Sequence, residues 1–388
     1  MSQIALITGG SGFLAQHLIR ELQTTFPDLF KEIRTVDRKV FAKNIDWADN
    51  IPVGSVTADC TSRTELEKVL SGSAKGCIYA NESPNVVFHL AAPNLPIPMI
   101  YDRQQFEKDC VEATYVLCEL MVEKSIPYLI HVSDANCLAH SVDVQGLQEI
   151  HSAEGPPNGK YLYGTAARIK FKAEAVGRSY NGRKMKNGKS LLVTTVRPGL
   201  LYGEADNWIA PYLFRYCKIN GSLPRFGDGC SILQFTYAGN VAHFLCVIME
   251  TQKTRPDLTS GEIFFCNEAT SPQYPFDYFE KLVQTGGYSL SSCKIQSHIL
   301  CLVLYFIQLV TFLLSLVGIN LNHQLPNAAM TFVTATGFLH YDTTKARLVL
   351  DYKPKYEPAK MMDKTLVWWK KNNSTFIQEK LCDSKKLQ

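Results

Sequence analysis

The first fifteen residues constrain the fold more than any other part of the chain. A short apolar run, IALIT, leads directly into GGSGFLA (residues 9–15), and the apolar spacing typical of a helix follows. Gly9 permits a tight turn, Gly12 lets the backbone approach a pyrophosphate, and the small Ala15 lets the helix pack closely on the strand. The N–H groups and the dipole at such a helix start favour a phosphate. This segment therefore predicts a dinucleotide-binding unit.

Short apolar runs alternate with helix-period segments through the first half of the chain. Six runs are candidate strands: IALIT, EIRTVD, VGSVTAD, NVVFHLAA, YLIHVSD and SLLVTTVRP. The alternation is typical of βαβ units around a parallel sheet. We predict an α/β fold with a Rossmann-type, doubly wound parallel sheet. At 388 residues the chain also exceeds the size of about 250–300 residues at which single cores stop growing, so a smaller C-terminal substrate lobe is expected.

An acidic residue ends the second predicted strand. The carboxylate of Asp37 can accept hydrogen bonds from the adenosine ribose hydroxyls and would repel a 2′-phosphate, which favours NAD. The neighbouring Arg38 carries a guanidinium that could bind that phosphate, so NADP is the alternative cofactor.

Composition excludes several other classes of protein. The net charge of +4 is small, and no Lys/Arg stripe with interleaved aromatic residues indicates a nucleic-acid partner. The twelve cysteines form no CxxC pair, which favours reduced core thiols over a disulfide framework or a metal site. The first residues read as a strand and not as a signal peptide, so we expect the cytosol or the cytosolic face of a membrane.

A long apolar segment lies in the last third of the chain. Residues 299–319 contain no charge and only three polar residues, Gln308, Thr311 and Ser315. The segment reaches the ~20 residues that a membrane helix requires, so we predict membrane contact, either spanning or within one leaflet. Lys385 and Lys386 near the end of the chain match a dilysine endoplasmic-reticulum signal.

Together these features predict four segments. Residues 1–200 form the NAD(P)-binding Rossmann domain, with elements near 235–250 returning to it. Residues 201–298 form the substrate lobe, 299–319 a membrane-associated helix, and 320–388 a segment that completes the lobe and ends in a polar tail. The polar stretch 139–160 is expected to be a surface loop.

Several motifs, in order along nearly the whole chain, resemble the 3β-hydroxysteroid dehydrogenase/isomerase family of extended short-chain dehydrogenases. They are TGGSGFL, TVDR, VFHLAAP, VRPGLLYGE, FTYAGNVAH and YDTTKARLVLDYKPKY. The resemblance implies NAD-dependent oxidation of a steroid 3β-hydroxyl, in some members with a double-bond shift. It also implies that Asp59 lies near the adenine, and that Ala91, Ala92 and Pro198 lie on the nicotinamide side. The predicted cofactor-binding residues are Gly9, Gly12, Phe13, Leu14, Asp37, Arg38, Asp59, Ala91, Ala92, Lys170 and Pro198.

The sequence departs from the catalytic pattern of that family, which places a Tyr four residues before a Lys. Matching the family's Lys to Lys170 leaves Ala166 at the Tyr position. Tyr163 and Lys170 share a helical face but lie roughly 10 Å apart along a regular helix, so an irregular helix start would be needed to bring them together. Our predicted catalytic residues are Tyr163 as base, Lys170 beside it to lower the pKa of its phenol, and Ser133.

Two further positions differ from the family. Asp134 occupies the position of its catalytic hydroxyl, and Cys110 that of a helical Asn. Two functions follow: a dehydrogenase with an altered site, or a cofactor-binding protein that has lost hydride transfer and serves in binding or regulation. A sterol-4-carboxylate 3-dehydrogenase and a nucleotide-sugar epimerase share most of these motifs. We expect a steroid or sterol substrate, membrane lipid as a partner, and the endoplasmic-reticulum membrane, with a mitochondrial membrane and a homo-oligomer as arrangements that the sequence allows.

Overall fold

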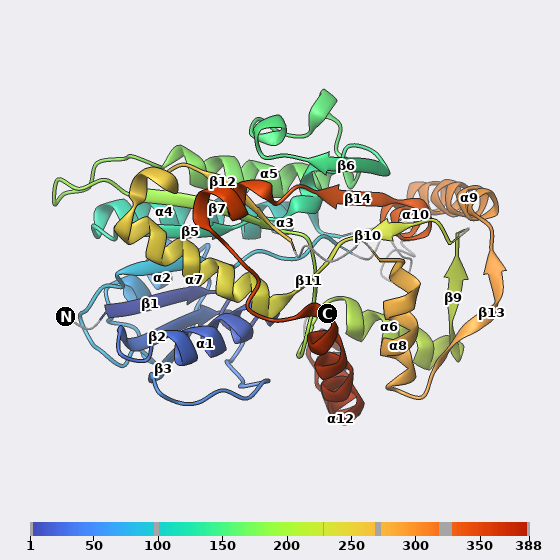
Figure 1. The fold of residues 1–388 in the computed structure, drawn as a ribbon, viewed down its shortest axis with the longest axis horizontal. Coiled ribbons are helices and arrows are strands. Elements are labelled where there is room, and N and C mark those ends of the chain that lie inside the picture. Colours follow the sequence, from blue (N-terminus) through green and yellow to red (C-terminus); the bar gives the residue numbers. More distant parts are fainter. Residues whose placement is uncertain (1–2, 97–100, 228, 268–272, 318–327, 386–388) are drawn as a thin grey trace.

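The computed structural model describes residues 3–96, 101–227, 229–267, 273–317 and 328–385. Seven parallel strands form one sheet in the order β12-β7-β5-β4-β1-β2-β3 (Figure 1). Their bounds are β1 Gln3–Thr8, β2 Phe30–Asp37, β3 Val53–Thr57, β4 Val86–His89, β5 Tyr128–Val132, β7 Leu192–Pro198 and β12 Ile263–Cys266. The order turns in both directions from β1, so the doubly wound parallel sheet predicted from the six apolar runs is confirmed.

The strands are apolar throughout because the sheet is covered on both faces. In β1, Ala5 and Ile7 join one core while Leu6 joins the other, as the alternation of side chains along a strand requires. Helices α1 (Phe13–Thr25) and α7 (Ala238–Thr254) pack together on the first face. Helices α2 (Arg63–Leu70) and α4 (Ala113–Glu123) cover the second, with α5 (Gly164–Ser179) beside α4.

The edge strand β12 differs from the segmentation drawn from the sequence. It lies within residues 201–298, which were assigned to the substrate lobe, yet Ile263 to Cys266 pair with Thr195 to Pro198 of β7. All four of its residues, IFFC, are buried. Four apolar residues give no periodicity that separates a sheet edge from a lobe strand, so the pairing could not be read from sequence.

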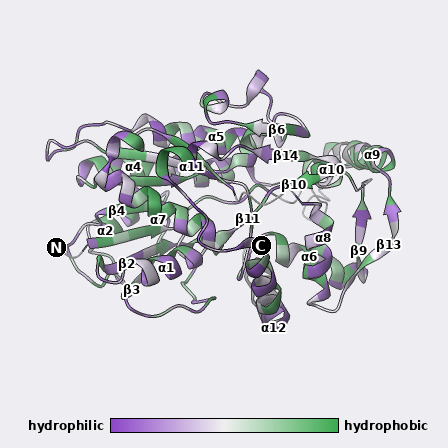
Figure 2. Ribbon diagram, in the orientation of Figure 1, coloured by the Kyte–Doolittle hydropathy of each residue, from purple (hydrophilic) through white to green (hydrophobic). Residues whose placement is uncertain are grey.

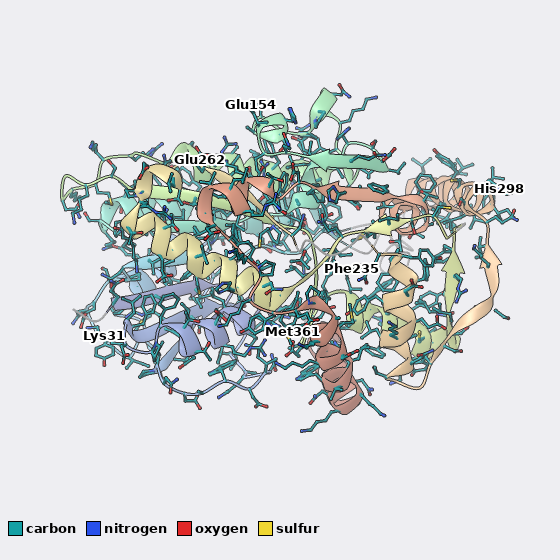
Figure 3. All side chains as sticks on the ribbon, in the orientation of Figure 1. Lys31, Glu154, Phe235, Glu262, His298 and Met361 are labelled. Atoms are coloured by element: carbon teal, nitrogen blue, oxygen red, sulfur yellow. The ribbon has the colours of Figure 1, made fainter. Side chains whose placement is uncertain are left out.

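The remaining elements build a second lobe beside the sheet (Figure 1). Figure 3 shows His298, in the first turn of α9, at the opposite end of the molecule from Lys31 of β2. The lobe contains α6 Ile209–Asn220, β9 Ser222–Phe226, α8 Pro275–Gln284, β13 Ser289–Ile295, α9 Ser297–Leu316, α10 Ala328–Thr336 and α12 Pro358–Lys385. Short strand pairs connect it to the sheet domain: β8 Leu200–Tyr202 with β11 Phe235–Tyr237, and β10 Ile232–Leu233 with β14 Phe338–Tyr341.

The stretch 139–160 is not simply the surface loop that its composition indicates. It contains β6 (Asp143–Leu147), which pairs in parallel with β14. Ser152 also attaches the segment to the sheet domain. The buried guanidinium of Arg197 in β7 donates to its hydroxyl at 3.0 Å and to Glu174 of α5 at 2.9 Å. A buried ion pair with these extra hydrogen bonds fixes the position of a segment whose own sequence is polar.

Helix α9 occupies most of the predicted apolar segment, of which residues 318 and 319 lie outside the described part of the chain. Many of its large apolar side chains are exposed, and Figure 2 shows the helix largely in the hydrophobic colours. They are Ile299, Leu302, Val303, Tyr305, Phe306, Leu309, Leu313, Leu316 and, just beyond the helix, Val317. Over the described residues, no helix combines the length and hydropathy needed to cross a membrane.

Candidate functional site

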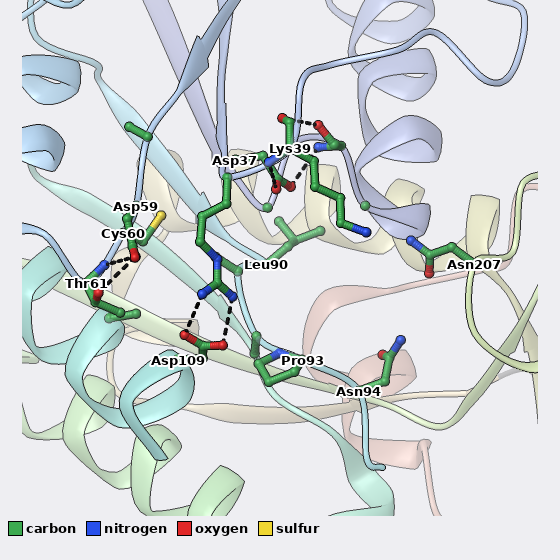
Figure 4. A pocket seen from close by; sticks show the side chains of 18 residues that line it. Asp37, Lys39, Asp59, Cys60, Thr61, Leu90, Pro93, Asn94, Asp109 and Asn207 are labelled. Carbon is green, nitrogen blue, oxygen red and sulfur yellow. Dashed lines mark hydrogen bonds and ion pairs between the residues drawn. The ribbon is translucent and has the colours of Figure 1, made fainter. Parts of the chain in front are cut away.

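A cleft of about 360 Å³ opens at the carboxyl ends of β1, β2, β3 and β4 (Figure 4). In doubly wound sheets, ligands bind at this edge, where the strand order reverses. The lining residues are Gly9, Ser11, Gly12, Asp37, Arg38, Lys39, Ala58, Asp59, Cys60, Thr61, Leu90, Ala91, Ala92, Pro93, Asn94, Asp109, Ala113 and Asn207.

The glycine turn has the shape that a pyrophosphate requires. Gly9 has a φ of +69°, and a Cβ there would lie 3.0 Å from the backbone of Ala91. Gly12 has an ordinary φ of −76°, but its Cβ would lie 2.9 Å from the carbonyl oxygen of Gly9. No side chain caps the start of α1, and its first turn carries no acidic residue. The N–H groups of that turn are therefore free to bind an anion.

Asp37 lines the cleft with its carboxylate held in place by two backbone N–H groups. Its Oδ2 accepts from the backbone N–H of Ser11 at 3.1 Å, and its Oδ1 accepts from that of Lys39 at 2.9 Å. These two amides orient the carboxylate, and each oxygen keeps a lone pair for a ribose hydroxyl. Asp59 follows β3 across the cleft, where its Oδ1 accepts from the backbone and the hydroxyl of Thr61 at 2.8 and 2.9 Å. The residues present thus fit NAD.

The structure separates the predicted cofactor residues into two groups. Gly9, Gly12, Asp37, Arg38, Asp59, Ala91 and Ala92 line the cleft, whereas Phe13, Leu14, Lys170 and Pro198 do not. Phe13 and Leu14 point into the core behind the glycine turn, so only their backbone groups can serve a phosphate. The cleft also contains residues that the sequence did not indicate, such as Asp109 and Asn207, which reach it from distant segments.

A buried polar chain leads to Ala91, one of the residues that line the cleft. The Thr8 hydroxyl lies 2.7 Å from His89 Nδ1, and the Thr114 hydroxyl lies 3.0 Å from His89 Nε2. Because Thr114 donates to the Cys110 carbonyl, it accepts from His89 Nε2–H, and Nδ1 accepts from Thr8. Burial holds the pKa of His89 well below its usual range. The ring is therefore a neutral connector between β1, β4 and α4, and Thr8 in turn accepts from the backbone N–H of Ala91.

The structure does not restore the Tyr–Lys pair that the resemblance leads us to expect. Ala166 is buried in α5 one turn before Lys170, so no phenol stands at that place. Lys170 makes no hydrogen bond or ion pair with any residue that the structure describes. Burial lowers the pKa of its ammonium, but the nearby carboxylate of Asp134 raises it, and the net direction is upward.

Tyr163 stands just before α5, at an irregular start. It has a φ of −90° and a ψ of 19°, and Gly164 follows with a φ of +61°. Although both residues are described, no hydrogen bond joins the phenol of Tyr163 to Lys170. Burial raises the pKa of Tyr163, and the charge of Asp134 raises it further. The direction of this pKa shift is thus opposite to the lowering that we expected from Lys170.

Just after β5, Asp134 carries a carboxylate whose charge acts on both of these groups. The pKa of Asp134 is raised by burial, against the opposing effects of Lys170 and Asn136. Its Oδ1 accepts from the Asn136 backbone at 2.9 Å and side chain at 3.0 Å. The adjacent Ser133 hydroxyl is buried without a partner among the described residues. Ser133, Asp134, Tyr163 and Lys170 make up the candidate proton-transfer site. The electrostatic effect of Asp134 on both Tyr163 and Lys170 could not be read from the sequence.

Ten cysteines fall in the described residues with their side chains, and all are free thiols. Burial raises the pKa of Cys118 and of Cys60 to about 12, so both stay protonated at neutral pH. Within the described part of the chain, no group of three or more His, Cys, Asp or Glu residues is placed to hold a metal ion.

Comparisons with known proteins agree with this geometry. A sequence model of the 3-beta hydroxysteroid dehydrogenase/isomerase family matches residues 6–297. Short-chain dehydrogenase/reductase family 42E member 1 of Danio rerio is 27% identical over 90% of this chain and 84% of its own. The decarboxylating sterol-4-alpha-carboxylate 3-dehydrogenase of Saccharomyces cerevisiae is 24% identical over 95% and 99%.

Solved structures share the fold. The dTDP-glucose 4,6-dehydratase DesIV of Streptomyces venezuelae, crystallised with NAD, superposes with a TM-score of 0.66 at 19% identity, over 96% of this chain and 98% of that one. The structure of gox2253 gives a TM-score of 0.67 at 17% identity, over 96% and 99%.

Proposed function

Because this chain belongs to the 3-beta hydroxysteroid dehydrogenase/isomerase family, we propose that it oxidises the 3β-hydroxyl of a steroid or sterol with NAD. The observation that carries the proposal is the cofactor cleft, with its open glycine turn and its oriented Asp37. Relatives named as sterol or steroid 3-dehydrogenases support the substrate class.

The residues of the cleft divide the work of holding the cofactor. The first turn of α1 and Gly12 receive the pyrophosphate, Asp37 the adenosine ribose, and Asp59 the adenine side. Ala91 and Ala92 line the inner end. NAD supplies the acceptor for the hydride that leaves the carbinol carbon.

The hydroxyl proton needs a base at the same time. We propose Tyr163 for this role, with the Ser133 hydroxyl binding the substrate oxygen and Lys170 binding the nicotinamide ribose. Asp134 is the competing base, because its carboxylate lies close enough to interact with both Tyr163 and Lys170. The carbinol would become a ketone as its proton moves to the base. On a 4-carboxylated sterol, the resulting β-keto acid would lose carbon dioxide.

Two observations favour a second function. Ala166 replaces the phenol of the family, and the raised pKa of Tyr163 makes that phenol a poor base at neutral pH. The alternative is a protein that binds NAD and a sterol without turnover and acts as a binding or regulatory partner.

A substrate panel distinguishes the two functions. The purified protein is incubated with NAD and 3β-hydroxysteroids, sterols and 4-carboxysterols, and the formation of NADH is followed by its absorbance. We expect turnover of at least one 3β-hydroxyl and none of 3α-hydroxyl epimers, which serve as the matched control. NAD binding without oxidation of any member would support the non-catalytic function.

Helix α9 supports lipid contact as a further part of this proposal. With about 100° of rotation per residue, its exposed apolar residues fall on one arc, opposite the buried Leu300, Leu304 and Thr311. Contiguous exposed apolar surface of this kind is typical of protein or membrane contacts. We propose that this arc binds the cytosolic face of the endoplasmic-reticulum membrane, where a sterol substrate is dissolved. Lys386 of the predicted dilysine signal lies outside the described residues.

Two lysines on the arc should release the protein from membranes. Leu302 and Leu309 are exposed and seven residues apart, so Leu302→Lys with Leu309→Lys places two charges on the lipid side without touching the core. A charge in the bilayer costs about 2.5–3.5 kcal/mol on insertion scales. We expect loss of the protein from carbonate-washed membranes. Leu348→Lys with Val367→Lys, equally exposed but on α11 (Thr344–Leu350) and α12, should stay bound. Equal release of both double variants, or no membrane-bound wild type, would contradict the proposal.

A further inference from the structure

Arg38 is the residue of the cleft whose side chain would favour NADP over NAD. It directly follows Asp37 and lines the same end of the cleft. A planar guanidinium with five N–H donors matches a phosphate bidentately, so a free arginine here would receive the 2′-phosphate of NADP. The side chain of Arg38 is 52% exposed, which leaves it accessible to such a ligand.

In this structure the guanidinium is already engaged. Its Nη1 donates to Asp109 Oδ1 at 2.9 Å, and its Nη2 donates to Asp109 Oδ2 at 2.7 Å (Figure 4). Asp109 is only 11% exposed, and Gln105 Nε2 donates to its Oδ1 at 2.8 Å, so the acceptor is held from two sides. The hydrogen bond to Asp109 is also the main reason why the pKa of Arg38 is raised.

The position of Asp109 depends on an irregularity of its helix. Residues Lys108–Glu112 form one π-helical turn between α3 (Arg103–Glu107) and α4. Such a turn holds one more residue than an α-helical turn and shifts the side chains that follow. It lies beside the cleft, so a carboxylate 71 residues away in sequence meets Arg38 there.

We infer that Asp109 sets the cofactor preference of this protein by occupying the Arg38 guanidinium, and this inference rests on the proposed NAD-binding function. A 2′-phosphate would have to displace two charge-assisted hydrogen bonds. It would also face the three carboxylates of Asp37, Asp59 and Asp109 against two cations, Arg38 and Lys39. The ribose hydroxyls of NAD need neither group to move.

The test compares the affinities of NAD and NADP by calorimetric titration of the full chain. In Asp109→Asn the guanidinium loses its ionic partner while the shape of the side chain is kept. We expect the ratio of NADP affinity to NAD affinity to rise by about tenfold, the gain typical of one charge-assisted bidentate contact. The gain should shrink as salt is raised from low to physiological concentration. In Asp109→Asn with Arg38→Ala, the ratio should return to the wild-type value.

Glu123→Gln is the matched control, because it removes another surface arginine–carboxylate pair, with Arg63, from the end of α4 and away from the cleft. Its ratio should equal that of the wild type. Asp109→Ser is the second variant if Asp109→Asn is unstable in thermal unfolding. An unchanged ratio in both Asp109 variants, a gain that persists without Arg38, or a wild type that prefers NADP would each overturn the inference. A wild type that binds neither dinucleotide would overturn the proposed function as well.

Discussion

Gly12→Val is expected to abolish NAD binding. The backbone at Gly12 is one that valine can adopt, so the effect comes from space and not from strain. Its Cβ would lie 2.9 Å from the Gly9 carbonyl, and the methyl groups beyond it would occupy the place of the pyrophosphate. Loss of two charge-assisted N–H contacts, each contributing about 1.5–3 kcal/mol, corresponds to at least about 100-fold in affinity. Calorimetric titration with NAD measures it.

Gly159→Val separates this effect from the general consequences of replacing a glycine. Gly159 has a φ of +63°, and no atom lies within 4 Å of the position its Cβ would take, so the variant introduces backbone strain far from any contact. It should lower the thermal unfolding temperature and leave NAD affinity intact. Gly12→Ala, a smaller change, should weaken binding by an intermediate factor. Unaltered NAD affinity in a folded Gly12→Val protein would show that the dinucleotide binds elsewhere.

The sheet was predictable because its signals are local. Each of the six apolar runs carries its own strand pattern, and the glycine turn with Asp37 identifies the cofactor end without reference to distant residues. Parallel strands that are buried on both faces have no polar face, so each appears in the sequence as a nearly continuous apolar run. Gly9 and Gly12, predicted from these signals, line the cleft, as does Asp59, which was expected there from the family resemblance.

Features that depend on distant pairing were not predictable. The polar stretch around β6 becomes a strand only because β14, almost 200 residues later, lies beside it. Asp109 contacts Arg38 from a π-helical turn, and no pattern of residues in the sequence predicts that turn. Sequence could therefore show that Arg38 complicates the choice between NAD and NADP, but not that another residue occupies its guanidinium.

The proton-transfer site was predictable only in part. The spacing between Tyr163 and Lys170 required an irregular helix start, and the positive φ of Gly164 supplies one. It does not bring the two side chains into a hydrogen bond, and the charges that act on the phenol of Tyr163 are those of Asp134 and Cys137. The effect of Asp134 on both groups is electrostatic and follows from three-dimensional placement, so spacing along one helix could not reveal it.

Tyr163→Phe is expected to remove turnover of a 3β-hydroxyl substrate while leaving NAD affinity nearly intact. A positioned general base contributes about 10²–10⁴-fold, and only the phenol oxygen is lost. Tyr163 does not line the cofactor cleft and makes no hydrogen bond to a described residue, so neither binding nor folding depends on that oxygen. Because burial raises the pKa of Tyr163, the wild-type rate should rise with pH into the alkaline range. Steady-state rates of NADH formation from neutral to alkaline pH measure both effects.

Tyr161→Phe and Asp134→Asn identify which group acts. Tyr161 is a neighbouring phenol whose ring lies 6.3 Å from that of Phe171, and its substitution should leave turnover unchanged. If Tyr163 is the base, Asp134→Asn removes a negative charge that raises the pKa of the phenol, so the alkaline rise should move to lower pH while turnover persists. If Asp134 is the base, turnover instead survives in Tyr163→Phe and disappears in Asp134→Asn, because the carboxylate then accepts the proton directly. The two variants therefore have opposite effects on turnover under the two mechanisms. Measuring the pH profiles of both variants shows which residue is the base.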